Sequence, residues 1–192
     1  MNKYFILFSL IISSVFTYDR NAAVAYAYKY WNNPNHQCGS THNEDYQRCS
    51  PYSYWGSEKC NYQSHGGDCA NFVSQCLIEG GHPKLKKPGV EYCRGWPCGV
   101  EPGAKKLGDC LSNQFHWRKN CGKMEKPPTD LQVGDVLIYH KESCNDGAAH
   151  AVLVSVAGSK PKITCHSSAK KDVDYTYMTG SHKYLEWLHY TG

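Results

Sequence analysis

The sequence has little that would place it in a membrane or on a nucleic acid. Its longest apolar run, the stretch 4–12 near the N-terminus, is shorter than the roughly 20 residues that a membrane helix needs. Lys and Arg number 21 against 17 Asp and Glu, a small excess beside the basic surface that nucleic-acid binding requires. We therefore expect a protein that neither inserts stably into membranes nor binds nucleic acid.

The sequence also lacks the close ligand pairs of a zinc site. No Cys-x2-Cys and no His-Glu-x2-His occurs, and the nearest approach is Cys93-x4-Cys98. In a secreted chain, a disulfide is the better interpretation of such cysteines. We therefore expect no metal and no other cofactor.

The N-terminus has the pattern of a signal peptide. Lys3 precedes the apolar stretch 4–12, and small residues follow before Thr17. We expect residues 1–17 to be this signal and residues 18–192 to form one domain, because that length suits one hydrophobic core and is short for two. The expected product is a monomer that is secreted, or held in the lumen of a secretory or phagocytic compartment.

Cysteine, by contrast, is abundant, and its number is odd. A secreted chain would pair most of its cysteines, so an odd number leaves at least one thiol outside a disulfide. If Cys69 is that thiol, ten cysteines remain for up to five disulfides, whose connectivity stays open. Cys76 cannot close on Cys69, because seven helical residues separate them by about 10 Å. The alternative is that a buried structural thiol such as Cys76 explains the odd number. The eleven cysteines are at positions 38, 49, 60, 69, 76, 93, 98, 110, 121, 144 and 165.

The segment around Cys69 predicts a helix with this cysteine in its first turn. Asp68 is a suitable N-cap, and Gly80-Gly81 ends the pattern. The apolar residues share one helix face: Cys69, Phe72, Val73, Cys76 and Leu77. Because the first turn has unsatisfied backbone N–H groups and the positive end of the helix dipole, it favours thiolate over thiol. Cys69 is therefore placed as a nucleophile would be.

The remaining pattern predicts an α+β protein. An opening helix is expected over 18–31, and a long excursion over 80–122 with a short helix near 111–117. Short β-branched runs then predict strands at 134–140, 150–156 and 162–166, and a further strand at 187–190. Helices followed by a meander of strands indicate an antiparallel sheet against which the Cys69 helix packs.

A cysteine nucleophile needs a base, and His150 is the strongest candidate among ten histidines. It opens a strand and shares a face with an apolar row of valines. His166, on the next strand, is the candidate for the polar group that orients this base. A three-residue turn centred on Gly158 would make the two histidines direct partners, whereas a longer turn would move them apart. Asn145 and Asp146 are weaker candidates for the orienting role.

The oxyanion of a tetrahedral intermediate needs hydrogen-bond donors beside the nucleophile. The backbone N–H of Cys69 is one candidate. Gln63, six residues upstream, and the Tyr62 hydroxyl are candidates for a second donor.

These segments resemble the putative amidase domain family, which is similar to the NlpC/P60 and CHAP branch of papain-like cysteine hydrolases. The resemblance rests on Asp68-Cys-Ala-Asn-Phe-Val-Ser-Gln75, the opening segment 18–26, and the strand segments 134–139, 150–155 and 165–167. It implies a papain-like fold with Cys69 as nucleophile, His150 as general base and His166 as the third, polar member. It also implies cleavage of amide bonds, most familiarly in the stem peptides of bacterial peptidoglycan, and hence an antibacterial role.

Two hypotheses follow for the function. The first is a secreted cysteine amidase or peptidase that hydrolyses amide bonds in peptidoglycan or another peptide substrate. The second is a disulfide-rich module that binds cell-wall glycopeptide without turnover, for which the 15 Tyr and 5 Trp would provide stacking surfaces.

Overall fold

The fold is taken from a computed structural model, which describes residues 17–32, 69–82, 85, 103–125, 128–145, 147–166 and 169–192. Almost all of the expected signal peptide lies outside these residues. So do Asp68, Asp146 and the two expected oxyanion donors, Gln63 and Tyr62. The described residues form an α+β structure whose six strands make one antiparallel sheet.

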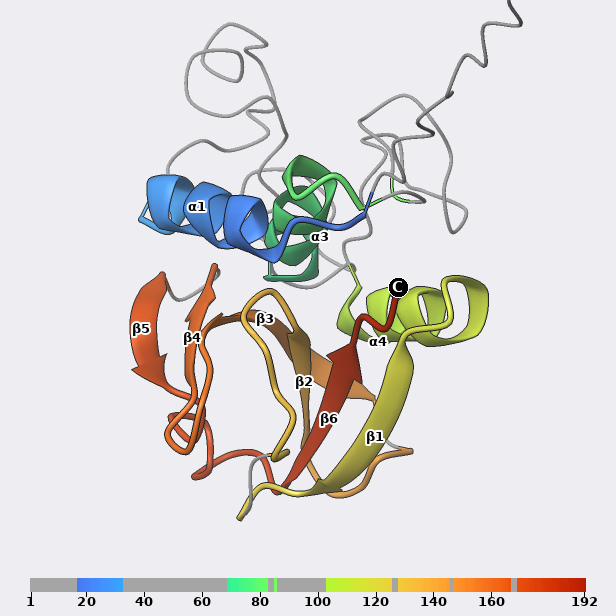
Figure 1. The fold of residues 1–192 in the computed structure, drawn as a ribbon. Coiled ribbons are helices and arrows are strands. Elements are labelled where there is room, and N and C mark those ends of the chain that lie inside the picture. The colour runs from blue at the N-terminus through green and yellow to red at the C-terminus, as the bar shows by residue number, and fades with distance from the viewer. Residues whose placement is uncertain are drawn as a thin grey trace, which may run out of the picture.

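The sheet has the strand order β1-β6-β2-β3-β4-β5, and each neighbouring pair is antiparallel. It curves strongly, and the helices gather on one side of it (Figure 1). The strands are β1 (Arg118–Lys123), β2 (Val136–His140), β3 (Ala148–Val156), β4 (Lys162–Cys165), β5 (Lys170–Asp174) and β6 (Tyr184–His189).

The two long helices confirm the prediction from the sequence. Helix α1 (Arg20–Tyr30) begins after Asp19, whose carboxylate accepts a hydrogen bond from the backbone N–H of Ala22 at 3.0 Å. Helix α3 (Cys69–Glu79) begins at the cysteine itself. The Cys69 thiol therefore lies at the N-terminal end of a three-turn helix.

The third helical segment lies earlier in the chain than the sequence suggested. Helix α4 (Ala104–Asp109) continues into the π-helical turn η1 (Cys110–Gln114), whereas the pattern placed a helix at 111–117. Leu107 and Leu111, four residues apart, are both fully buried on the same side. Their burial against the sheet fixes where this segment is helical.

The predicted strands are present, and the two edge strands were missed. β2, β3, β4 and β6 correspond to the four apolar runs. β1 and β5 are mostly exposed and rich in Lys, as edge strands that resist further pairing often are. Polar edge strands carry no period-2 pattern, which is why the sequence did not reveal them.

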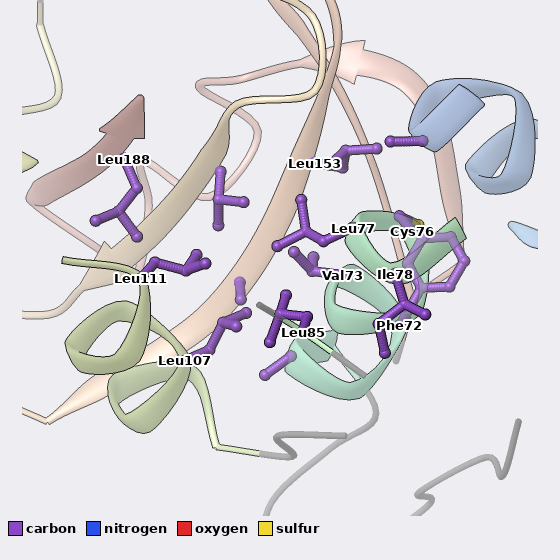
Figure 2. Close-up of a cluster of buried hydrophobic side chains, with 14 of the residues drawn as sticks. Phe72, Val73, Cys76, Leu77, Ile78, Leu85, Leu107, Leu111, Leu153 and Leu188 are labelled. Atoms are coloured by element: carbon purple, nitrogen blue, oxygen red, sulfur yellow. The ribbon is translucent and has the colours of Figure 1, made fainter. Parts of the chain in front are cut away.

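Alternate residues of the central strands serve two separate hydrophobic clusters. Ala151 and Leu153 of β3 pack with α1, α3 and α4 on the helix side of the sheet. Val152 and Val154 pack on the opposite side. In Figure 2, Leu77 of α3, Leu107 and Leu111 lie around the same interior as Leu153 and Leu188. The helices are thus held on the sheet by a continuous apolar layer.

A buried carboxylate ties the start of the chain to the sheet. Asp135 is fully buried just before β2 and lies 2.5 Å from the Arg20 guanidinium of α1. Its other oxygen lies 2.8 Å from His189 Nδ1 and accepts the backbone N–H of Gln132, also at 2.8 Å. Arg20 further donates to the carbonyls of Val133 and Tyr190. One carboxylate therefore joins α1, β2 and β6.

Gly134 makes this approach possible. Its φ is +79°, and a Cβ there would meet the Tyr18 hydroxyl at 2.8 Å and Arg20 Cβ at 3.0 Å. The Tyr18 hydroxyl instead donates to the Gly134 carbonyl at 2.8 Å. A side chain at this position would push α1 away from the sheet.

Disulfides hold the periphery. Cys121 of β1 is joined to Cys144 in the loop between β2 and β3, with a Cα to Cα distance of 6.0 Å. Cys110 is disulfide-bonded too. Among the residues described, no helix has the length and apolar character needed to cross a membrane.

We expect Asp135→Asn to destabilise the fold by about 3 kcal/mol. The amide would turn an N–H₂ donor toward groups that are themselves donors, and would leave the Arg20 charge without its carboxylate. Urea unfolding followed by circular dichroism measures this change.

The matched control is Asp109→Asn, which removes an exposed carboxylate 2.6 Å from Lys105. Its effect should stay within about 0.5 kcal/mol. Equal effects of the two substitutions would contradict the role given to Asp135.

Candidate active site

Cys69 lies at the first position of α3 as a buried thiol. It is outside any disulfide, and 5% of its surface is exposed. Cys76 and Cys165 are the other described thiols, and both are buried. The sequence-based expectation that Cys69 stays outside the disulfides therefore agrees with the structure.

The polar residues that follow Cys69 serve to seat the helix. The Ser74 hydroxyl donates to the Ala70 carbonyl at 2.8 Å, and the Tyr26 hydroxyl of α1 donates to the Gln75 amide oxygen at 2.9 Å. All residues from 69 to 78 are buried. Gln75 thus fixes α3 against α1, whereas Ser74 bonds within its own helix.

His166 lies on the helix side of the sheet. It follows β4 directly, and its ring stacks on Phe72 of α3 with centroids 3.8 Å apart and an interplanar angle of 16°. Its Nε2 lies 2.7 Å from the Tyr30 carbonyl oxygen. Because a carbonyl only accepts, Nε2 must carry the proton. His166 therefore links α1 to α3 near the start of the nucleophile helix.

His150 lies on the other side of the sheet. It pairs with Tyr139 of β2, and the two rings are stacked with centroids 6.2 Å apart. Tyr177 is close, at 6.4 Å between ring centroids. The His150 Nε2 atom is buried and makes no hydrogen bond within the described part of the chain.

A three-residue turn centred on Gly158 would have made His150 and His166 direct partners. The structure does not bring these two histidines together. The β3–β4 register pairs Leu153 with Thr164 and Val154 with Ile163, one residue away from the register that would make the histidines partners. The connecting turn spans residues 157–161. A shift of one residue sends side chains to opposite faces, so the expectation that His166 orients His150 finds no support in the geometry.

Burial makes His150 a weak base. It lowers the pKa of this imidazole from its ordinary 6.5 to about 4, and the nearby His182 contributes in the same direction. At neutral pH His150 is therefore uncharged, which is the form that can accept a proton.

A second buried thiol, Cys165, contacts a neighbour of His150. Cys165 Sγ is 3.6 Å from the Tyr177 hydroxyl oxygen. Burial raises the pKa of the Cys165 thiol to about 11, and the electrostatic effect of Cys69 adds to the rise. Cys165 therefore contacts Tyr177, whose ring lies 6.4 Å from that of His150.

The sequence did not indicate Tyr177 or His182 as neighbours of His150. Both lie in the turns between β5 and β6, where the sequence has neither helical nor strand periodicity. The weaker candidate Asn145 is exposed, and its backbone N–H bonds the Ser143 hydroxyl. No group of three or more His, Cys, Asp or Glu side chains in the described ranges could hold a metal ion.

The fold and this site define an α+β protein with a buried thiol at the start of a helix that packs on an antiparallel sheet. The model of the putative amidase domain family matches residues 17–189. The chain therefore belongs to this family, whose description indicates hydrolysis of amides. Comparison with curated proteins and with solved structures found no match.

The depressed pKa of His150 predicts a loss of stability in acid. An unfolded histidine binds its proton near pH 6.5, whereas the folded one resists until about pH 4. Stability should therefore fall as the pH drops from 6.5 to 4, by up to about 3 kcal/mol from this residue.

Urea unfolding of the wild type and of His150→Gln at pH 6.5 and pH 4.5 isolates this contribution. The variant should lose much less stability over that interval. His116→Gln, at an exposed position, should keep the wild-type pH dependence. An identical pH dependence in wild type and His150→Gln would contradict the buried, neutral state of His150.

Proposed function

We propose that the protein is a secreted cysteine amidase or peptidase in which Cys69 is the nucleophile. The observation that carries this proposal is the Cys69 thiol at the first residue of α3 in a chain that belongs to an amidase family. A thiol at a helix start is favoured as thiolate, the nucleophilic form. The packing of that helix on an antiparallel sheet agrees with a papain-like arrangement similar to NlpC/P60 and CHAP hydrolases.

The proposed reaction passes through an acyl-enzyme. The base, for which the sequence offers His150, takes the Cys69 proton, and the thiolate attacks the amide carbonyl carbon to form a tetrahedral intermediate. That intermediate collapses as the C–N bond breaks and His150 gives the proton to the leaving amine. Water, deprotonated by His150, then attacks the thioester carbonyl carbon. The C–S bond breaks, the acid leaves, and His150 returns the proton to the Cys69 thiolate.

The ring of His150 is held by packing in this account. Tyr139 and Tyr177 border it, whereas His166 fixes the nucleophile helix through Phe72. In this proposal Cys69 and His150 exchange the proton, whereas the contacts of His166 are those of a structural support. Peptidoglycan stem peptides are the proposed substrate, because related domains cut amide bonds there.

The cysteine content supports secretion. The Cys121–Cys144 disulfide and the disulfide at Cys110 need an oxidising compartment to persist. A protein outside the cytosol, or in a phagocytic compartment, would meet bacterial cell walls directly.

One observation favours a second candidate, a module that binds cell-wall glycopeptide without cleaving it. His150 projects to the face of the sheet opposite α3, and its Nε2 makes no hydrogen bond among the described residues. A non-catalytic module would need no contact between thiol and imidazole.

Peptidoglycan digestion by Cys69→Ala separates the two candidates. An amidase should lose at least about a thousandfold in rate, as nucleophile removal does in other hydrolases. Cys76→Ala, two turns further along the same helix, should keep most of the activity. Digestion by Cys69→Ala at the wild-type rate would contradict the amidase proposal.

Alkylation gives an independent readout. Iodoacetamide at mildly acidic pH should modify Cys69 rapidly if it is a catalytic thiolate, whereas Cys165, with its raised pKa, should react slowly. Peptide mapping by mass spectrometry identifies the modified residue. Equal, slow labelling of both thiols would favour the binding module.

A further inference from the structure

A cavity of about 560 Å³ lies away from Cys69, on the side of the sheet that carries His150. Its walls come from the end of β1, the loop after β2 and the turns before β6. They include Lys123, Glu125, Glu142, His182 and Lys183. Its size is within the range of sites that take small ligands.

The walls of this cavity are fixed by the fold. Between Lys123 and Glu125, Met124 is buried; its backbone N–H donates to the Lys183 carbonyl at 3.1 Å, and its carbonyl accepts the Tyr175 hydroxyl at 3.3 Å. The Cys121–Cys144 disulfide ties β1 to the loop that carries Glu142. The cavity is therefore preformed, which lowers the entropic cost of binding a ligand.

The charges on the walls are both positive and negative, and half of them are already paired. Lys183 Nζ lies 2.6 Å from a Glu142 carboxylate oxygen. Lys123 and Glu125 are exposed and form no ion pair with any residue that the structure describes. One ammonium group and one carboxylate are thus available to a ligand, on either side of the anchored Met124.

The inner end of the cavity reaches the surroundings of His150. His182 lines the cavity and is 5% exposed. Its ring lies 6.1 Å from that of Tyr139, which stacks on His150. His182 also contributes to the lowered pKa of His150. A ligand bound in the cavity would therefore change the environment of the His150 ring.

We propose that this cavity binds a small zwitterion, namely an amino acid or a short peptide with a free amino group and a free carboxylate. Lys123 would pair with the carboxylate and Glu125 with the ammonium group. Thr176 and Thr179 provide polar groups, and Met124 and Tyr184 provide apolar contact for the side chains. This proposal does not rest on the proposed function, because it needs no reaction at Cys69.

Calorimetric titration of the Cys69→Ala protein with trialanine tests the proposal without consuming the peptide. Trialanine should bind, and blocking its amino group by acetylation or its carboxylate by amidation should each weaken binding about two- to fivefold, as expected for losing one solvent-accessible ion pair. Bound trialanine should also shift the His150 and His182 ring resonances in NMR spectra.

Two variants assign the charges. Lys123→Gln should weaken binding of trialanine but not of its amidated form, and Glu125→Gln should weaken binding of trialanine but not of its acetylated form. Lys105→Gln, at an exposed lysine outside the cavity, should change neither.

The proposal is overturned if trialanine does not bind, if the doubly blocked peptide binds equally well, or if Lys123→Gln behaves like Lys105→Gln. Loss of peptidoglycan digestion in Cys69→Ala does not bear on any of these outcomes. Failure here and failure of the amidase proposal are therefore distinguishable.

Discussion

The ion pair between Arg20 and the buried carboxylate of Asp135 is the constraint on which the rest of the arrangement depends. It joins the first helix to the sheet, and His189 completes it from β6. Helix α1 then holds α3 through the Tyr26 to Gln75 hydrogen bond and through the backbone N–H of Asp19, which donates to the Gly80 carbonyl at 2.7 Å. Asp135 therefore positions Cys69 indirectly: it holds α1 on the sheet, and α1 holds the helix that begins at Cys69.

The sheet separates two environments that the proposed chemistry must connect. On the helix side, His166 packs flat on Phe72 and bonds the end of α1. On the other side, His150 is surrounded by tyrosines and kept neutral by burial. Cys165 is a buried thiol on the His150 side, where it touches Tyr177. Reaction at Cys69 would take place on the helix side, while His182 lines a cavity on the side that carries His150.

Much of the fold could be predicted from the sequence because it follows from local periodicity. The helix at Cys69 and the strands that begin near 134, 150 and 162 follow from apolar spacing and from Gly and Pro boundaries. The edge strands β1 and β5 could not be predicted, because their solvated side chains carry no pattern. The relation of His150 to His166 could not be predicted either. It depends on the β3–β4 register, which shifts by one residue when the connecting turn is one residue longer. The sequence allows both turn lengths. Tyr177 and His182 approach His150 through long-range packing alone.

The central claim is that Cys69 forms a covalent acyl intermediate, and trapping that intermediate tests the claim most directly. The protein would be mixed with an excess of an activated peptide ester, quenched in acid within milliseconds, and digested for mass spectrometry. The account predicts an acyl group on the peptide that contains Cys69, and none when His150→Gln or Cys69→Ala is treated in the same way. Turnover of the ester by wild type with no adduct at Cys69, or with the adduct on Cys165, would contradict it.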